Sequence, residues 1–257
     1  MPYFIDTHAH LYLSEFDADR NSAVENAVYR GVKKILLPNI DGASIEPMNK
    51  LAEQFPGVCF AMMGLHPTSV KENYKEELDR VEKELSRKKY CAVGEIGIDL
   101  YWDKTRLKEQ NIAFSNQLDL ALKFNLPVAI HARESFKEIF DILGAFKKKG
   151  LRGVFHAFTG TTEIAKEVID FGFLLGIGGV LTYKKSSLPD VIRNVDLSHI
   201  LLETDSPFLT PVPFRGKRNE SSYIPYIAEA IGKLKSTTID EVARLTTANA
   251  LNLFELE

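Results

Sequence analysis

The sequence predicts an α/β fold, a (β/α)8 TIM barrel. Short, continuously apolar segments rich in Val, Ile, Leu and Phe alternate with helical segments along almost the whole chain. Strands of this composition are buried on both faces, as in a parallel sheet. Eight such strand and helix units in 257 residues fit the size of one barrel. We therefore expect a single domain over residues 1–257, which ends in additional C-terminal helices.

The predicted strands are short and lie between predicted helices. They cover residues 4–11, 34–38, 58–67, 91–99, 127–131, 153–156, 173–179 and 200–205. The predicted helices cover about 17–29, 44–55, 75–88, 104–124, 135–148, 162–171, 188–194, 222–234 and 239–253. Gly31 is a typical residue to end the first helix. A doubly wound open sheet would instead place a Gly-rich phosphate turn after its first strand.

Composition narrows the class of protein. The chain is 45% hydrophobic and 26% charged, with a formal net charge of −3. The chain lacks the overall positive charge that is typical of nucleic-acid-binding proteins. A phosphodiester substrate would therefore need metal ions and a local basic cluster to bind it. Cys59 and Cys91 lie in apolar runs, which predicts buried reduced thiols and a cytoplasmic location. The sequence shows no signal peptide, and its apolar runs are too short to span a membrane.

Residues that bind metals gather at one end of the predicted strands. In a barrel, the C-terminal strand ends meet at one rim, where active sites lie. The residues at these ends are His8, His10, His66, Glu95, His131, His156 and Asp205. His199 precedes the last strand, so we expect it on the opposite rim. A single histidine in a strand is usually a core residue, but a repeated position at one strand end predicts a metal site.

The ligand number points to two divalent ions. Residues i and i+2 of a strand share a face, so His8 and His10 can reach the same ion. The set is too large for one tetrahedral ion, and two ions about 3.5–4 Å apart with a bridging carboxylate would use it fully. We expect Glu95 to bridge, His8, His10 and Asp205 to flank one ion, and His131 and His156 to hold the other.

This ligand set predicts hydrolysis by an activated water. A metal-bound water has a pKa near neutrality and can act as the nucleophile. Asp205 would accept its proton as general base, with Glu95 as the other catalytic carboxylate. No Gly-x-Ser-x-Gly elbow and no Walker loop occurs in the chain.

Several residues beside the predicted metals are candidates for substrate binding. His66 would contact the scissile phosphate or the leaving oxygen, and Arg133 would clamp a phosphate or pair with Glu134. Glu203 would orient a ligand, bind substrate or serve as a buried structural carboxylate. The loop 206–221 carries a basic cluster that would contact backbone phosphates, or be merely solvated: Arg215, Lys217 and Arg218. Rim aromatics that would stack a base or pack the loops are Tyr101, Trp102 and Phe158.

The motifs resemble those of the TatD-type metal-dependent deoxyribonucleases of the amidohydrolase superfamily. The matching segments are Asp6–Leu11, Gly64–Pro67, Gly94–Asp99, Pro127–Arg133, His156–Gly160, Leu202–Pro207 and Arg215–Asn219. The resemblance covers essentially the whole chain; Ala157 stands where many relatives carry Cys. It implies a metal-dependent 3′–5′ exonuclease that cleaves phosphodiester bonds at single-stranded DNA ends. Mg²⁺ is the expected metal, with Mn²⁺ or Zn²⁺ as alternatives, and no obligatory protein partner is expected.

Two other function classes stay open. The same barrel could hydrolyse another ester or amide bond, as an aminoacyl-tRNA deacylase, a small phosphotriesterase or an amidohydrolase. Many cyclic-amide hydrolases bridge their metals with a carboxylated lysine on the fourth strand, where this chain has Glu95 and no lysine. A noncatalytic binding protein on a degenerate barrel is the third possibility, and the complete ligand set argues against it.

Overall fold

The computed structural model describes residues 3–256 and has the strand and helix order that the sequence predicts. Its strands are β1 (Phe4–Asp6), β2 (Val32–Leu37), β3 (Cys59–Ala61), β4 (Val93–Asp99), β5 (Val128–Arg133), β6 (Gly153–Phe155), β7 (Leu174–Ile177) and β8 (Ile200–Leu202). Its helices are α1 (Arg20–Tyr29), α2 (Ile45–Gln54), α3 (Tyr74–Arg87), α4 (Leu107–Phe124), α5 (Phe136–Leu143), α6 (Thr162–Asp170), α7 (Leu188–Asn194), α8 (Ile224–Lys235) and α9 (Ile239–Phe254). Within residues 3–256, no helix combines the length and apolar character needed to cross a membrane.

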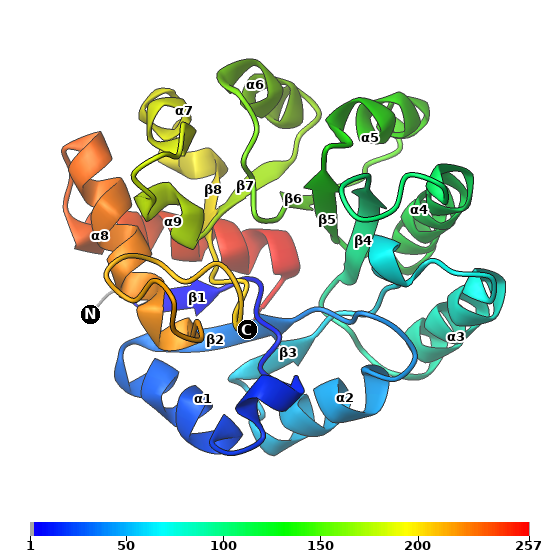
Figure 1. Ribbon diagram of the computed structural model, residues 1–257, viewed down its shortest axis with the longest axis horizontal. Coiled ribbons are helices and arrows are strands. Elements are labelled where there is room, and N and C mark those ends of the chain that lie inside the picture. The colour runs from blue at the N-terminus through cyan, green and yellow to red at the C-terminus, as the bar shows by residue number, and fades with distance from the viewer. Residues whose placement is uncertain (1–2, 257) are drawn as a thin grey trace.

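All strand pairs are parallel, and the strands follow chain order around the centre of the molecule (Figure 1). The strands form two hydrogen-bonded sets, one in the order β1-β2-β3 and the other in the order β4-β5-β6-β7-β8. Isolated parallel bridges pair Met63 with Val93 and Ala9 with Ser206, between the two sets of strands. Helices α1 to α8 lie outside the strands in Figure 1. The predicted (β/α)8 architecture is confirmed.

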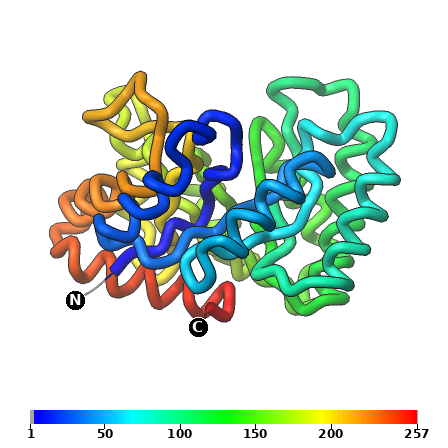
Figure 2. Tube along the Cα trace, turned by 90° about the horizontal axis from the view of Figure 1, so that it is seen from below, coloured from blue at the N-terminus to red at the C-terminus, as the bar shows by residue number. Residues whose placement is uncertain are grey.

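Helix α9 packs against the N-terminal ends of the strands. Leu253 and Phe254 are buried in one apolar cluster with Ile5 of β1, Leu36 of β2 and Met62, which directly follows β3. Figure 2 shows α9 (red) at one end of the molecule and the loop after β8 (orange) at the other. One end of the barrel is therefore packed with apolar side chains, and polar chemistry is confined to the opposite rim.

Three strands end at least three residues earlier than predicted. β1 ends at Asp6, β3 at Ala61 and β8 at Leu202. Helix α4 also begins three residues later than predicted, at Leu107. In the loop before it, the carboxylates of Asp99 and Asp103 accept hydrogen bonds from following backbone N–H groups. Such local bonds compete with helix formation, which delays the start of α4.

We expect Phe254→Ala to lower the free energy of unfolding by about 3 kcal/mol, because it leaves a cavity under the barrel. Asn252→Ala is the matched control, since Asn252 is exposed on the same helix turn and should change stability by less than about 0.5 kcal/mol. Urea denaturation would measure both. Equal unfolding midpoints for the two variants would show that α9 does not seal the core.

Candidate metal centre

Glu95, on β4, is the carboxylate around which the histidines gather. It is only 2% exposed, and its two oxygens face different sets of nitrogens. Oε2 lies 3.0 Å from His8 Nε2 and 3.4 Å from His10 Nε2. Oε1 lies 2.8 Å from His131 Nδ1, 2.8 Å from His156 Nε2 and 3.1 Å from His66 Nε2. The structure therefore brings Glu95 and all five predicted histidines together.

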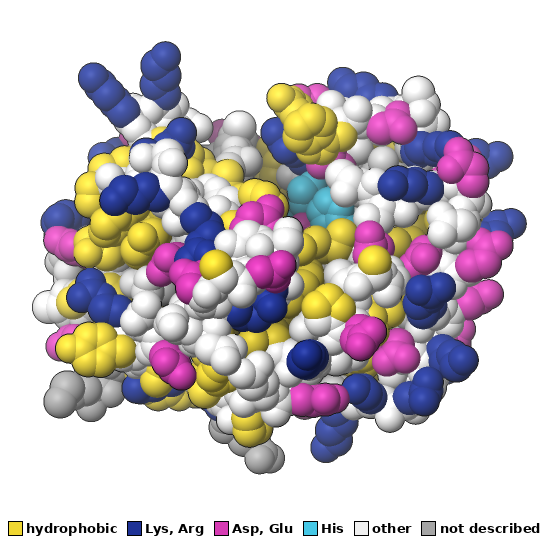
Figure 3. All heavy atoms as spheres, turned by 60° about the horizontal axis from the view of Figure 1, so that its bottom comes forward, with side chains coloured by type: hydrophobic (Ala, Val, Ile, Leu, Met, Phe, Trp, Pro, Cys, Tyr) yellow, Lys and Arg dark blue, Asp and Glu magenta, His cyan; other side chains and the backbone are white. Residues whose placement is uncertain are grey.

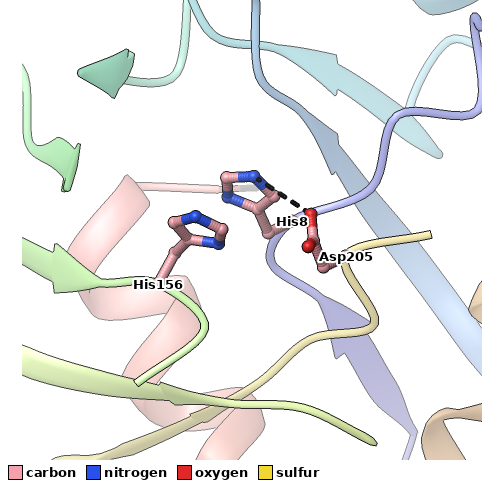
Figure 4. A group of neighbouring side chains, drawn as sticks. All are labelled: His8, His156 and Asp205. Atoms are coloured by element: carbon pink, nitrogen blue, oxygen red, sulfur yellow. Dashed lines mark ion pairs between the residues drawn. The ribbon is translucent and has the colours of Figure 1, made fainter. Parts of the chain in front are cut away.

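Asp205 completes the cluster from the segment after β8. Its Oδ1 lies 3.8 Å from His8 Nε2 and 3.6 Å from His10 Nε2. Figure 4 shows His8, His156 and Asp205 directed toward one another from three segments that are distant in sequence. The rings of His8 and His156 stack with their centroids 3.7 Å apart. The predicted ligands of both ions thus lie around one carboxylate.

His8 and His10 lie beyond the end of β1, so the predicted strand through Leu11 is wrong in length. The chain nevertheless stays anchored on both sides. The backbone N–H of Ala9 donates to Leu36 O at 3.0 Å, and that of His10 donates to Ser206 O at 2.7 Å. These bonds hold His8 and His10 so that both side chains reach Glu95, as the period of two predicts.

Gly97 allows β4 and β5 to approach closely at the site. It pairs with His131 in the ladder and has a φ of +142°. A Cβ atom at this position would lie 2.0 Å from His131 O, so a side chain would push β5 away. The glycine thereby places His131 beside Glu95 and Asp99, which flank it on β4.

Asp99 orients His131, and the sequence reasoning missed it as a functional residue. Its Oδ2 accepts a hydrogen bond from His131 Nε2 at 2.9 Å. Because that nitrogen carries the hydrogen, Nδ1 is left to face Glu95. Asp99 is four residues after Glu95 on the same strand, so the period of two could have identified it. Carboxylates that hold a metal-binding histidine in this way are common outer partners of metal sites.

Tyr12 orients His10. Its hydroxyl donates to Pro38 O at 2.6 Å, so it accepts from His10 Nδ1 at 2.9 Å. The Nε2 atom of His10 is then left for a proton or a metal ion. Tyr12 lies in a turn beyond the strand, and no sequence signal indicated its role.

His66 has the opposite arrangement. The backbone N–H of Thr68 donates to His66 Nδ1 at 3.1 Å, so this nitrogen has no hydrogen. The hydrogen of the neutral ring is on Nε2, which points at Glu95. Burial lowers the pKa of His66 although Glu95 raises it, which favours the neutral ring. His66 therefore presents a hydrogen-bond donor to the site, although its position also allows metal contact.

The charges of the cluster favour a cation. Burial alone would raise the pKa of Glu95, but His156, His66 and His8 hold it well below its usual range. Burial opposes protonation of His156, yet Glu95 and Glu203 raise the pKa of that histidine well above its usual value. The Glu95 carboxylate is therefore ionised and attracts positive charge.

The donor set fits divalent metal ions. Three groups each offer ligand atoms within 4.8 Å of one another: His8, His156 and Asp205; His8, His10 and Glu95; and His66, Glu95 and His131. Mixed imidazole and carboxylate ligation suits Zn²⁺ or Mn²⁺, and carboxylate oxygens suit Mg²⁺. Tyr12 and Asp99 contact one ring nitrogen each of His10 and His131, and the other ring nitrogen of each histidine faces Glu95. Candidate ligands of a metal centre are therefore in place.

An open cavity of about 680 Å³ lies over the cluster. Figure 3 shows histidine at the floor of this hollow, with hydrophobic side chains around it. Arg133 and Trp102 line it, and the Arg133 guanidinium lies 3.7 Å from the centre of the Tyr101 ring. Glu134, the alternative partner of Arg133, pairs with Lys104 instead at 3.4 Å. Phe158, in contrast, is buried in the core.

Glu203 lies behind the metal cluster. Its carboxylate is buried and accepts a hydrogen bond from the Ala157 backbone N–H at 2.5 Å. His156 Nδ1 lies 3.6 Å from the same oxygen. This position suits the predicted orienting role, whereas Glu203 does not line the cavity that substrate would enter.

The basic residues after β8 divide into two kinds. Arg218 bonds both carboxylate oxygens of Asp19, at 2.6 and 2.7 Å, and also contacts Glu220 at 3.0 Å. It therefore joins the loop to the start of α1. Arg215 stacks 3.8 Å over Tyr183, and Lys217 is exposed. A phosphate contact by each of the three stays a prediction, and the guanidinium of Arg218 is already occupied.

We expect Asp99→Asn to weaken binding of a divalent metal by about 10- to 100-fold, because His131 loses its charged partner. Titration calorimetry of metal-free protein with Mn²⁺ would measure this. Asp103→Asn is the matched control, since Asp103 is exposed in the following loop and its carboxylate accepts hydrogen bonds from Thr105. Equal affinities for both variants would remove Asp99 from the metal site.

We expect Arg218→Ala to lower the free energy of unfolding by about 1 kcal/mol, through loss of its bonds to Asp19. Lys217→Ala serves as the control, because the ammonium group of Lys217 has no partner within residues 3–256. This variant should change the free energy of unfolding by less than about 0.5 kcal/mol. Thermal or urea unfolding checks both. An unchanged stability for Arg218→Ala would contradict its anchoring role.

Comparison with known proteins places the chain among metal-dependent hydrolases. The family model described as TatD related DNase matches residues 5–255. YabD of Bacillus subtilis, an uncharacterized metal-dependent hydrolase, is 37% identical over 98% of both chains. YjjV of Escherichia coli, also an uncharacterized metal-dependent hydrolase, is 31% identical over 98% of both chains.

Solved structures share the fold. The crystal structure of YjjV, a TatD homologue, matches with a TM-score of 0.93 at 30% identity over 99% of this chain and 98% of that chain. A TatD family hydrolase from Entamoeba histolytica matches with a TM-score of 0.84 at 23% identity over 98% of both. The resemblance seen in the motifs is confirmed: the chain belongs to the TatD-related DNase family and is a metal-dependent hydrolase.

Proposed function

We propose that this protein is a 3′–5′ exonuclease that cleaves phosphodiester bonds at the ends of single-stranded DNA. The observation that supports this most is Glu95, whose two oxygens face two sets of histidine nitrogens below an open cavity. Two divalent ions held there, with Mg²⁺ as the proposed metal and Mn²⁺ or Zn²⁺ as alternatives, would polarise the phosphoryl oxygen and lower the pKa of the attacking water.

Asp205 is the proposed general base. Burial would raise its pKa, but His10, His156 and His8 lower it below the usual value, so the carboxylate is ionised at neutral pH. It lines the cavity and can take the proton of the attacking water. The protonated Asp205 then returns the proton to solvent through the open mouth.

His66 is the proposed donor to the phosphate or the leaving oxygen. Its Nε2–H points into the cavity floor, because Thr68 holds the other ring nitrogen. A neutral imidazole in this position stabilises negative charge that develops on an oxygen. Arg133 at the rim would hold a phosphate by two parallel N–H bonds.

The size of the cavity supports action at a strand end. A volume of about 680 Å³ lies in the range of small-ligand sites, so it suits one or two nucleotides of a flexible strand better than a duplex. Arg215 and Lys217, outside the cavity, would contact phosphates farther along that strand.

A gel assay on 5′-labelled single-stranded DNA tests the proposed function. We expect successive shortening from the 3′ end in Mg²⁺, Mn²⁺ or Zn²⁺, none in EDTA, and none with Glu95→Ala. Protein that binds two ions but leaves the oligonucleotide intact in every metal would refute the nuclease. Ester and amide substrates, including aminoacyl-tRNA, would then be tested on the same site.

We expect Asp205→Asn to lower kcat on single-stranded DNA by at least about 100-fold, because the amide cannot accept the proton. Lys217→Ala is the control and should change KM while leaving kcat within about 2-fold. Steady-state kinetics with a fluorescent oligonucleotide measures both. A kcat within 10-fold of the unaltered protein would exclude Asp205 as the base.

A further inference from the structure

Trp102 is an aromatic side chain that the catalytic site does not use. It lies in the loop 100–106 after β4, lines the cavity, and is 71% exposed. When a second flat, apolar surface covers an aromatic ring that was exposed to water, the free energy falls. Its position at the mouth means that a substrate bound over Glu95 passes beside it.

The loop that carries Trp102 is held in place by the site itself. Asp99 Oδ1 accepts hydrogen bonds from the backbone N–H groups of Tyr101 at 2.9 Å and Trp102 at 3.1 Å. The other oxygen of Asp99 holds His131. The side chain of Gln110, on α4, fixes Asp99 in turn. Its Oε1 accepts from the Asp99 backbone N–H at 2.8 Å, and its Nε2 donates to Asp99 O at 3.1 Å. The backbone that carries the indole is therefore anchored to the metal cluster.

Arg133 supplies a charge beside the indole. Its guanidinium lies 3.7 Å from the centre of the Tyr101 ring and 5.5 Å from that of Trp102. Within residues 3–256 this guanidinium has no ion pair and no side-chain hydrogen bond, since the neighbouring Glu134 pairs with Lys104. Stacking on Tyr101 fixes its plane, while its N–H donors are free to bind an anion.

We propose that Trp102 and Arg133 form a subsite for one nucleotide at the mouth of the cavity, in which the base stacks on Trp102 and its phosphate binds Arg133. A flat aromatic ring next to a free planar cation matches the two parts of a nucleotide. Every base has a π-face, so the subsite accepts any base sequence but requires a base. The inference rests on the proposed function, because it assigns a position to the DNA strand that this function requires.

Binding measurements test the subsite without turnover. The chain contains one tryptophan, so its emission reports on Trp102 alone. Asp205→Asn protein in Mg²⁺ would be titrated with a five-residue oligothymidylate and with an abasic phosphodiester of equal length and charge. We expect the thymidylate to quench the emission and to bind at least about 10-fold more tightly than the abasic chain. Equal affinities without quenching would overturn the subsite.

Substitutions then assign the effect to the indole. Binding of the same two chains, labelled with fluorescein, would be followed by anisotropy in the Asp205→Asn background. Trp102→Ala should remove the preference for bases, and Trp102→Phe should restore part of it. Tyr29→Ala is the matched control, since Tyr29 is 89% exposed on α1 and should leave the preference unchanged. A preference that survives in Trp102→Ala would also overturn the proposal.

Kinetics separates this inference from the proposed function. With thymidine 5′-(p-nitrophenyl) phosphate, Trp102→Ala should raise KM by about 10-fold and leave kcat within about 2-fold. With methyl p-nitrophenyl phosphate, which has no base, the variant should equal the unaltered protein. If unaltered protein cleaves DNA and Trp102→Ala is equal on both small substrates, only the subsite fails. If unaltered protein cleaves no phosphodiester in any metal, the proposed function fails and the subsite with it.

Discussion

A buried carboxylate that is charged needs compensation, and Glu95 imposes this requirement on the whole barrel. Taken out of water, an ionised carboxylate costs several kcal/mol unless opposite charges or hydrogen bonds surround it. Here five histidines, which come from β5 and from the segments after β1, β3 and β6, supply those partners. The parallel strands, arranged in chain order around the centre of the molecule, bring these separate segments to one point. The architecture and the metal centre are thus two aspects of one constraint.

Asp6, the last residue of β1, links the first strand to the segment after the last strand, next to the candidate ligands. Its carboxylate accepts from the Thr204 backbone N–H at 3.0 Å and from the Thr204 hydroxyl at 2.6 Å, which joins the first strand to the last. His8 and Asp205 each directly flank this junction in space, since the Asp205 N–H donates to His8 O at 2.9 Å. Burial raises the pKa of Asp6 to about 7, although hydrogen bonds from Ser221 and Thr204 lower it.

The sequence predicted the barrel and the cluster because both depend on periodicity and on where apolar segments end. His131 and Asp205 could be found in this way, and the structure places them at Glu95. Hydrogen bonds that turn a ligand could not be predicted as readily, because Tyr12 meets Pro38 O only after the chain folds. Arg218 illustrates the same point: its partner Asp19 is 199 residues away in sequence, and no local pattern connects them.

Asp99 divides its two oxygens between His131, a proposed metal ligand, and the backbone of the rim loop. The same carboxylate therefore affects both the orientation of the His131 ring and the conformation of the loop. A metal ion that fixes the ring of His131 also restricts the loop at the mouth, and a ligand that orders the loop restricts the ring. Reciprocity of binding free energies would then make metal binding at His131 and ligand binding at the loop cooperative.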